Sequence, residues 1–378
     1  PTMLRSALLL ATLAPAVSAQ TVWFVDDDAG SGADFNDLQS AVDAASPGDR
    51  IEVLPGNYPD FASISKGITV MAETPGTALM GSLSVTGLPA GELLVLTDLT
   101  YGPSGGITLL SCPGTVLVDG GTARFSTFGC EDVRIQDVWS SSLTLRDSFV
   151  QVTDANGTVG PIFAESSTVI LSNVASRGIS GTVQSTFGCS AIDGEPALEC
   201  GDSDVWLLDC SFIGGDGALG PDISCDALPG SGIRAVDSTV HIARTQVESG
   251  FFPIGTFTPP PISTFQSQVL QDETLAAMQL RGGNRVGETA EFATLAGPFT
   301  VGRLWAGRTP LRAPFGDSID VLHSYERGVS LGFISLSGQN VIPFTIPALP
   351  RGTVIHAQAR RTTKVRSDNS NAVALIVR

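Results

Sequence analysis

The sequence contains very little lysine and histidine, and its charge is strongly negative in the larger part of the chain. Lys66 and Lys364 are the two lysines among 378 residues, so most cations are arginines. Residues 20–271 hold 30 Asp and Glu against 8 Lys and Arg. Because phosphate binding needs clustered cations, this composition argues against nucleic acid as a partner.

Motifs for several common chemistries are also missing. The three histidines are scattered, at His241, His323 and His356, and no CxxC pair is present, so a zinc site is not expected. The sequence has no G-x-S-x-G, no dinucleotide-binding motif and no phosphate-binding loop. We therefore expect no resident organic cofactor and no Ser-His-Asp hydrolase.

Beyond the first residues, no apolar run is long enough to span a membrane as a helix. Residues 1–19 have the pattern of a secretory signal peptide: Arg5, an apolar core over Ala7–Leu13, and small residues ending at Ala19. We expect cleavage near Ala19 and a secreted or cell-surface protein.

Six cysteines follow this export signal, and an even number in an oxidising compartment favours disulfides. Sequence alone cannot choose among the possible pairings. We predict local bridges between successive turns of the chain: Cys112–Cys130, Cys189–Cys200 and Cys210–Cys225.

A short helix followed by a strand is predicted near the N-terminus. Apolar residues recur at helical spacing over Asp34–Ala45, with Asp34 as the expected N-cap. Pro47 and Gly48 end the helix, and Ile51–Leu54 is the expected strand.

From residue 51 to about 250, apolar strand-like runs repeatedly end in Asp or Asn. This pattern predicts stacked coils, because alternation buries one face of each strand and a short polar side chain suits a tight corner. Two runs only ten residues apart, at Val133 and Leu143, indicate two strands within one coil. The runs are Leu94–Asp98, Thr115–Asp119, Val133–Asp137, Leu143–Asp147, Val169–Asn173, Val205–Asp209 and Val240–Arg244.

Residues 272–378 differ from the preceding region in composition and carry a net positive charge, with 8 Asp and Glu against 12 Lys and Arg. About seven short runs separated by Gly, Pro and Asn predict antiparallel strands. We expect a solenoid over 20–256, a proline-containing linker over 257–271 and a small β-sandwich over 272–378.

The predicted helix, the following Gly-Asp turn, the strand and the corner at Pro55-Gly56-Asn57-Tyr58 resemble the N-terminal cap and first coil of the pectin-lyase-like superfamily. This resemblance implies an all-β fold: a right-handed parallel β-helix with an N-terminal capping helix, followed by a small antiparallel β-sandwich. The ending from Ile355 to Val373 resembles small C-terminal β-domains of secreted bacterial proteins. The superfamily includes lyases, hydrolases and non-catalytic adhesins, so the fold does not decide function.

Sequence motifs of the catalytic members are absent here. The NTD, DD, GHG and RIK motifs of polygalacturonases and the vWiDH and RxPxxR signatures of pectate lyases do not occur. The lyases of this superfamily combine calcium with a basic Arg or Lys, so Asp204, Asp209, Arg234 and His241 are the catalytic candidates if the protein is an enzyme. Calcium is the one ion considered, with Asp202, Asp216 and Asp222 as candidate ligands and a merely solvated acidic loop as the alternative.

The favoured function is therefore a non-catalytic one: binding of a glycan or another cell-envelope component, or a structural or adhesive role. Trp139, Trp206 and Phe212 are candidate contacts, with core packing as the alternative for each. The alternative function is a calcium-dependent polysaccharide lyase or a glycoside hydrolase acting on acidic polysaccharide. A structural part whose ends stack into fibres is a third hypothesis, and the oligomeric state stays open.

Overall fold

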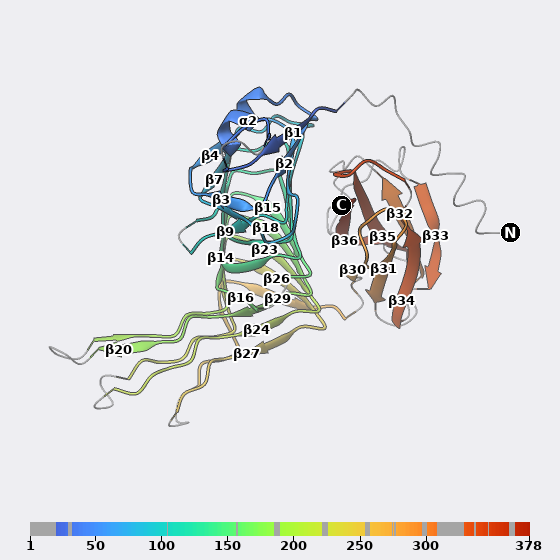
Figure 1. Cartoon of the computed structure of the whole chain (residues 1–378). Helices are drawn as coiled ribbons and strands as arrows, with labels where there is room; N and C mark the ends of the chain where they lie inside the picture. Colours follow the sequence, from blue (N-terminus) through green and yellow to red (C-terminus); the bar gives the residue numbers. More distant parts are fainter. Residues whose placement is uncertain are drawn as a thin grey trace. The chain divides into compact units, whose positions relative to one another are not determined.

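The computed structural model describes residues 20–28, 32–103, 105–155, 158–184, 190–220, 226–253, 258–273, 275, 277–296, 301–307, 329–335, 338–346, 348–362 and 367–378 (Figure 1). Trp23–Pro47 and Ile51–Asp272 form one compact unit, and Glu273–Arg378 belong to a second. No helix within the described ranges is long and apolar enough to cross a membrane.

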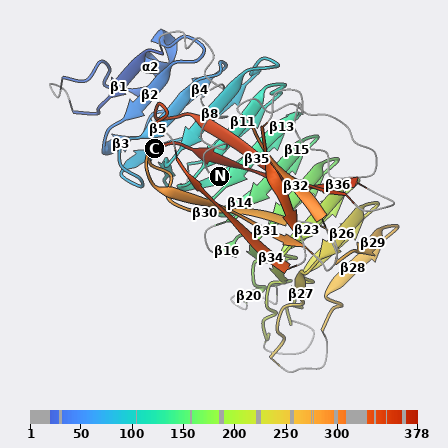
Figure 2. The same ribbon diagram turned by 90° about the vertical axis from the view of Figure 1, so that its right-hand side faces the viewer.

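The first unit is a parallel β-helix built from two long sheets and one short sheet, which confirms the predicted fold. Its coils stack along one axis, as the neighbouring strands β8, β11, β13 and β15 show in Figure 2. Sheet A contains β1 (Val22–Val25), β2 (Arg50–Val53), β5 (Thr69–Ala72), β8 (Leu93–Thr97), β11 (Thr115–Asp119), β13 (Asp132–Gln136), β15 (Phe149–Thr153), β18 (Thr168–Ser172), β23 (Asp204–Leu208), β26 (Thr239–Ala243) and β29 (Gln268–Gln271).

Sheets B and C complete each coil. Along the main path of sheet B lie β4 (Ala62–Ile64), β7 (Leu83–Thr86), β10 (Ile107–Leu110), β12 (Thr122–Phe128), β14 (Trp139–Arg146), β17 (Ile162–Glu165), β22 (Leu198–Gly201), β25 (Ile233–Val236) and β28 (Ile262–Phe265). Beside that path lie β3 (Gly56–Tyr58), β6 (Ala78–Met80) and β9 (Thr100–Tyr101). Sheet C contains β16 (Thr158–Val159), β19 (Ala175–Arg177), β24 (Ser211–Ile213) and β27 (Gln246–Glu248). As predicted, the runs at Val133 and Leu143 belong to two strands, one in sheet A and one in sheet B.

Stacked aliphatic side chains form the core of the solenoid. In sheet A one inward position is valine in six consecutive coils, and all six side chains are fully buried. Burying one such side chain contributes about 1.5–3 kcal/mol, and valine also fits the pleated strand. These residues are Val116, Val133, Val150, Val169, Val205 and Val240.

The N-terminal helix is shorter than predicted and has a different cap. Helix α2 spans Leu38–Ala44, and Asp37 is its N-cap. The Asp37 carboxylate accepts the Ser40 backbone N–H at 2.8 Å and the Ser40 hydroxyl at 2.7 Å, which lowers the pKa of Asp37. Asp34, the predicted cap, instead accepts the backbone N–H of Phe24 at 2.9 Å, because Phe35 pairs with Val25 as extended chain.

The predicted corner role of Asp and Asn is confirmed except at Asp119, which lies within β11 and leaves the corner to Gly120. The polar residues that end the strands adopt left-handed backbone conformations, with φ between 47° and 60°. Asp and Asn tolerate this region better than most side chains, and glycine takes the same role at Gly120 and Gly129. The Asp and Asn residues concerned are Asp98, Asp137, Asp147, Asp154, Asn173, Asp202, Asp209 and Asp237.

The corner from sheet B to sheet A carries a column of serines, each directly after a residue in the left-handed conformation. Each serine Oγ accepts the backbone N–H of the residue at the same corner of the preceding coil, at 3.1–3.2 Å, and donates to the carbonyl two residues before itself. This serine ladder joins neighbouring coils without leaving the corner N–H groups unsatisfied. Its members are Ser148, Ser167, Ser203, Ser238 and Ser267.

The last coil differs from the sequence prediction. Residues 257–271 were expected to be a linker, but they supply β28 and β29, which pair with β25 and β26. The prolines before β28 fit this position because the edge strand uses Pro261 only as an acceptor, for the Ile233 N–H at 3.0 Å. Residues inserted between the strands of sheets C and B form an arm that projects beyond β24 and β27 and carries the hairpin of β20 (Thr182–Gln184) and β21 (Ser190–Ile192) (Figure 1).

The second unit consists of two antiparallel sheets, as predicted for the C-terminal region. One holds β30 (Ala277–Gly282), β31 (Thr289–Ala296) and β34 (Gly338–Thr345). The other holds β32 (Val301–Gly307), β33 (Val329–Ser335), β35 (Val354–Thr362) and β36 (Ser367–Ile376). Met278 and Phe292 pack against Ala357 and Val373, so residues of both sheets share one core.

A candidate ligand-binding groove on the outer face of sheet B

The outer face of sheet B presents its side chains in straight columns, because the parallel strands pair in register. One column begins with hydroxyl groups in five successive coils: Ser63, Ser84, Thr108, Ser126 and Thr144. It continues through Phe163 and Glu199 to Arg234. The column therefore changes from small hydroxyls to an aromatic ring and charged groups between β14 and β17.

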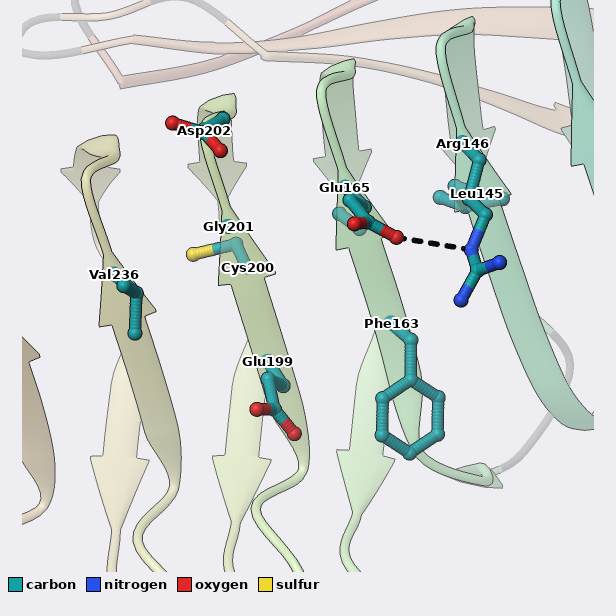
Figure 3. Close-up of a pocket in the computed structure, with 10 residues that line it drawn as sticks. Leu145, Arg146, Phe163, Glu165, Glu199, Cys200, Gly201, Asp202 and Val236 are labelled. Carbon is teal, nitrogen blue, oxygen red and sulfur yellow. Dashed lines mark ion pairs between the residues drawn. The ribbon is translucent and has the colours of Figure 1, made fainter.

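The neighbouring outward column contains a gap. Arg146, Glu165, Gly201 and Val236 occupy successive strands, and Gly201 has no side chain. A Cβ added at Gly201 meets no atom within 4 Å, and its backbone does not need the left-handed conformation. The gap opens a depression of about 350 Å³, lined among others by Phe163, Glu165, Glu199 and Val236 (Figure 3).

Two ion pairs border this groove. Arg146 Nε lies 3.0 Å from Glu165 Oε2, and Arg234 Nη1 lies 3.4 Å from Glu199 Oε1. All four side chains are at least one-third exposed. Exposed ion pairs contribute little to stability, so little free energy is lost when a ligand replaces one partner. Because the side chains are exposed, their hydrogen-bonding groups can reach a ligand.

Asp202 adds a third carboxylate at the rim. It occupies the left-handed corner after Gly201, with φ of 47°, and it lines the same depression (Figure 3). The groove thus combines an aromatic ring with cationic donors and anionic acceptors. Such a set can hold a ligand that offers both an apolar face and many hydroxyl groups.

The four catalytic candidates from the sequence do not converge on one site. Asp204 and His241 do meet, on the outer face of sheet A, with His241 Nε2 3.2 Å from Asp204 Oδ1. Arg234 lies on sheet B beside Glu199, and Asp209 binds Arg244 at a corner, with Nε 2.7 Å from Oδ1.

The predicted calcium ligands likewise lie apart. Asp216 on the arm forms an ion pair with Arg177 and accepts the Phe251 N–H at 2.9 Å, so both of its oxygens have partners within the chain. Asp202 lies at the sheet B corner, and Asp222 lies outside the described residues. Within the described part of the chain, no group of three or more His, Cys, Asp or Glu is arranged to hold a metal ion.

The three aromatic candidates have different environments. Trp139, on β14, is 48% exposed. Trp206 stacks on His241 on the outer face of sheet A, with ring centroids 4.7 Å apart and planes 3° apart. Phe212 is fully buried in the solenoid core, so its role is packing rather than ligand contact.

The groove residues Arg146, Phe163, Glu165, Glu199 and Gly201 were missed by sequence reasoning. Residues two apart in a strand point to the same side of a sheet. The sequence therefore did indicate that Phe163 and Glu165 share one face, and that Glu199 and Gly201 share one face. Thirty-two residues of chain separate the end of β17 from the start of β22, counting Ser166 through Ala197. Their register therefore could not be read from spacing.

Four cysteines are described, and all are buried free thiols: Cys112, Cys130, Cys200 and Cys210. The predicted Cys112–Cys130 bridge is therefore not formed in this structure, where both side chains are reduced. Cys200 points into the core from β22, and Cys210 lies 3.3 Å from the Leu171 carbonyl. Burial raises the pKa of both thiols, to about 11 for Cys200 and about 12 for Cys210. The partners predicted for them, Cys189 and Cys225, lie outside the described residues, so those two pairings stay predictions.

Comparisons with known proteins add little to this description. No protein-family model matches the chain, and no curated protein matches it. Among solved structures, the chain is similar to a mutant of AlyGC, a PL6 family alginate lyase, with a TM-score of 0.25 and 10% identity. The similarity covers 68% of this chain and 41% of that one, so this chain spans less than half of the lyase. Strand order and register by themselves show that the first unit has a parallel β-helix fold.

Proposed function

We propose that this protein is secreted and binds a neutral, hydroxyl-rich polysaccharide on the outer face of sheet B without cleaving it. The observation that carries the proposal is the gap at Gly201, which opens a groove between charged and aromatic side chains. A glycine that no steric contact requires is consistent with a position kept clear for a ligand.

The chemistry of the groove favours sugar hydroxyls. Arg146 and Arg234 supply N–H donors, while Glu165 and Glu199 supply acceptors next to them. Phe163 offers an apolar surface for one face of a pyranose ring, which carries C–H groups. Because the solenoid is strongly acidic, a neutral polymer meets less repulsion than a polyanion does.

The hydroxyl column extends the groove along the solenoid axis. Thr144 and Ser126 follow Phe163 in the same outward column, at the strand spacing of about 4.8 Å. A polymer lying across the strands can therefore meet one hydroxyl-bearing rung after another. This arrangement supports a chain-like ligand over a single small molecule.

One observation favours the alternative, a calcium-dependent lyase or a hydrolase acting on acidic polysaccharide. The groove gathers two arginines with three carboxylates, Glu165, Glu199 and Asp202, and these are the residue types that such chemistry uses. In that case a calcium ion brought in with an anionic polymer would bridge it to the carboxylates.

The decisive experiment compares the wild-type protein with Gly201→Leu. Leucine fills the groove without a backbone clash, so we expect binding to fall at least tenfold while the thermal unfolding midpoint stays within about 2 °C. Binding would be measured by calorimetry against neutral and acidic polysaccharides, with calcium and with a chelator. Gly201→Ala, whose methyl group leaves most of the space open, is the matched control and should bind nearly as well as wild type.

Two outcomes would overturn the proposal. Polysaccharide binding that Gly201→Leu leaves unchanged would place the ligand elsewhere on the molecule. Calcium-dependent release of unsaturated or reducing ends from an acidic polymer would replace binding with catalysis and direct mutagenesis to Glu165, Glu199 and Arg234.

A further inference from the structure

The serine ladder at the sheet B to sheet A corner changes its chemistry at its N-terminal end. The position that precedes Ser148 in the ladder is Cys130, whose backbone N–H donates to Ser148 Oγ at 3.1 Å. The position before that is Cys112. Both thiols lie near the carbonyl two residues earlier, as the serine hydroxyls do: Cys112 Sγ is 3.4 Å from Leu110 O, and Cys130 Sγ is 3.6 Å from Phe128 O.

The two cysteines occupy equivalent positions in consecutive coils. Leu110 pairs with Phe128 in register, and the Glu131 N–H donates to the Cys112 carbonyl at 2.9 Å. Parallel neighbours of this kind lie about 4.8 Å apart, and a disulfide spans Cα separations of about 4.4–6.8 Å.

We propose that Cys112 and Cys130 form a disulfide that takes the place of one rung of the serine ladder. A sulfur atom is a poor acceptor, so it cannot replace the bond that a serine Oγ makes to the N–H of the preceding coil. A covalent bond between the same two side chains joins the coils instead. The bridge therefore has a defined structural role, which the sequence-based pairing did not provide.

The electrostatics of the pair agree with this geometry. The neighbouring Cys130 side chain lowers the pKa of the Cys112 thiol to about 6, and the Cys112 side chain together with burial raises the pKa of Cys130. Cys112 is thus the more readily ionised thiol, and thiolates carry out disulfide exchange.

The reaction needs an oxidant, for which we name a small-molecule disulfide such as oxidised glutathione. One cysteine thiolate attacks this disulfide, forms a mixed disulfide and releases one thiol. The second thiolate attacks the bound cysteine sulfur, closes the Cys112–Cys130 bond and releases the second thiol. Two protons and two electrons pass from the cysteines to the oxidant. Both cysteines are at most 2% exposed, so we expect closure before the corner is fully packed during folding.

Peptide mapping tests the bridge directly. Trypsin cleaves after Lys66, Arg124 and Arg134, which places Cys112 and Cys130 on separate peptides that contain no other cysteine. After refolding of the full chain with oxidised glutathione and alkylation of free thiols in denaturant, we expect Gly67–Arg124 to be linked to Phe125–Arg134. Recovery of both peptides in alkylated, unlinked form would overturn the proposal.

A serine variant tests the role in the ladder. In Cys112→Ser/Cys130→Ser the ladder continues with its usual residue, so the variant should fold. Oxidised wild type should unfold at a higher temperature than reduced wild type, because the bridge restricts the unfolded chain, and this difference should vanish in the double variant. If oxidised and reduced wild type unfold at the same temperature, the bridge does not stabilise the junction between the two coils.

Discussion

The outer faces of sheets A and B use the same residue types in opposite ways. On sheet A, Arg134 donates two hydrogen bonds to Asp132, at 3.1 and 3.2 Å. On sheet B, Arg146 and Glu165 are 58% and 61% exposed and meet through one contact of 3.0 Å. Charge pairing alone therefore does not mark a functional site.

What separates the two faces is whether the polar groups are already satisfied. The sheet A carboxylates Asp119 and Asp132 accept from Gln136 and Thr115 as well as from their other neighbours. On sheet B the charged groups flank the open position at Gly201. The comparison assigns structural roles to Asp119 and Asp132 on sheet A and leaves the groove on sheet B as the candidate for recognition.

The largest expected effect separates the two arginines directly. Arg134→Ala removes both hydrogen bonds that the Arg134 side chain donates to the Asp132 carboxylate, and hydrogen bonds between charged groups contribute about 1.5–3 kcal/mol each, so we expect the free energy of unfolding to fall by about 3 kcal/mol. Arg146→Ala should cost about 0–1 kcal/mol, because an exposed pair contributes little. Urea denaturation of both variants measures the difference. Equal losses would remove the distinction between the two faces.

The corner between the faces should be nearly as sensitive. Ser167→Ala removes the Oγ that accepts the Ser148 N–H at 3.2 Å and donates to the Glu165 carbonyl at 2.8 Å. Leaving a buried donor unsatisfied costs about 1–3 kcal/mol. Hydrogen exchange should show faster exchange of the Ser148 amide in this variant. Ser167→Cys, which retains a side chain of similar shape but weakens the acceptor, should lie between wild type and Ser167→Ala.

Backbone conformation gives a smaller expected effect at the same corner. Asp147 has φ of 47°, which glycine adopts freely and β-branched residues resist. We expect Asp147→Val to lower the free energy of unfolding by about 1–2 kcal/mol. Asp147→Gly should match or exceed wild type in thermal melting. A valine variant as stable as the glycine variant would show that the corner relaxes into another conformation.

The smallest expected effect concerns the groove itself. Gly201→Ala meets no atom within 4 Å and restricts the unfolded chain, so stability should rise by about 0.4–1 kcal/mol. By contrast, a Cβ at Gly121 would lie 2.0 Å from the Leu99 carbonyl oxygen, and φ there is 85°. Gly121→Ala should therefore be destabilising in the same denaturation series. A loss of stability in Gly201→Ala would indicate that the position is constrained by the fold rather than open.

Much of the fold could be predicted because it depends on local chemistry. The valine run in sheet A follows from alternation within single strands, and the Asp and Asn corners follow from their tolerance of left-handed backbone. The helix prediction missed its cap by three residues, because Asp34 and Asp37 are both plausible caps and the pairing of Phe35 with Val25 decides between them. The linker prediction was wrong because prolines that end a domain and prolines that precede an edge strand look alike in sequence.

The sequence by itself determined that strands end in corners, that the core is aliphatic and that the chain changes character after residue 272. Only the tertiary structure decided which residues stand side by side, because the register between coils depends on insertions of unequal length. That register brought Asp204 to His241 and separated both from Arg234. It also placed Gly201 between Glu165 and Val236, so the groove exists only once the coils are stacked.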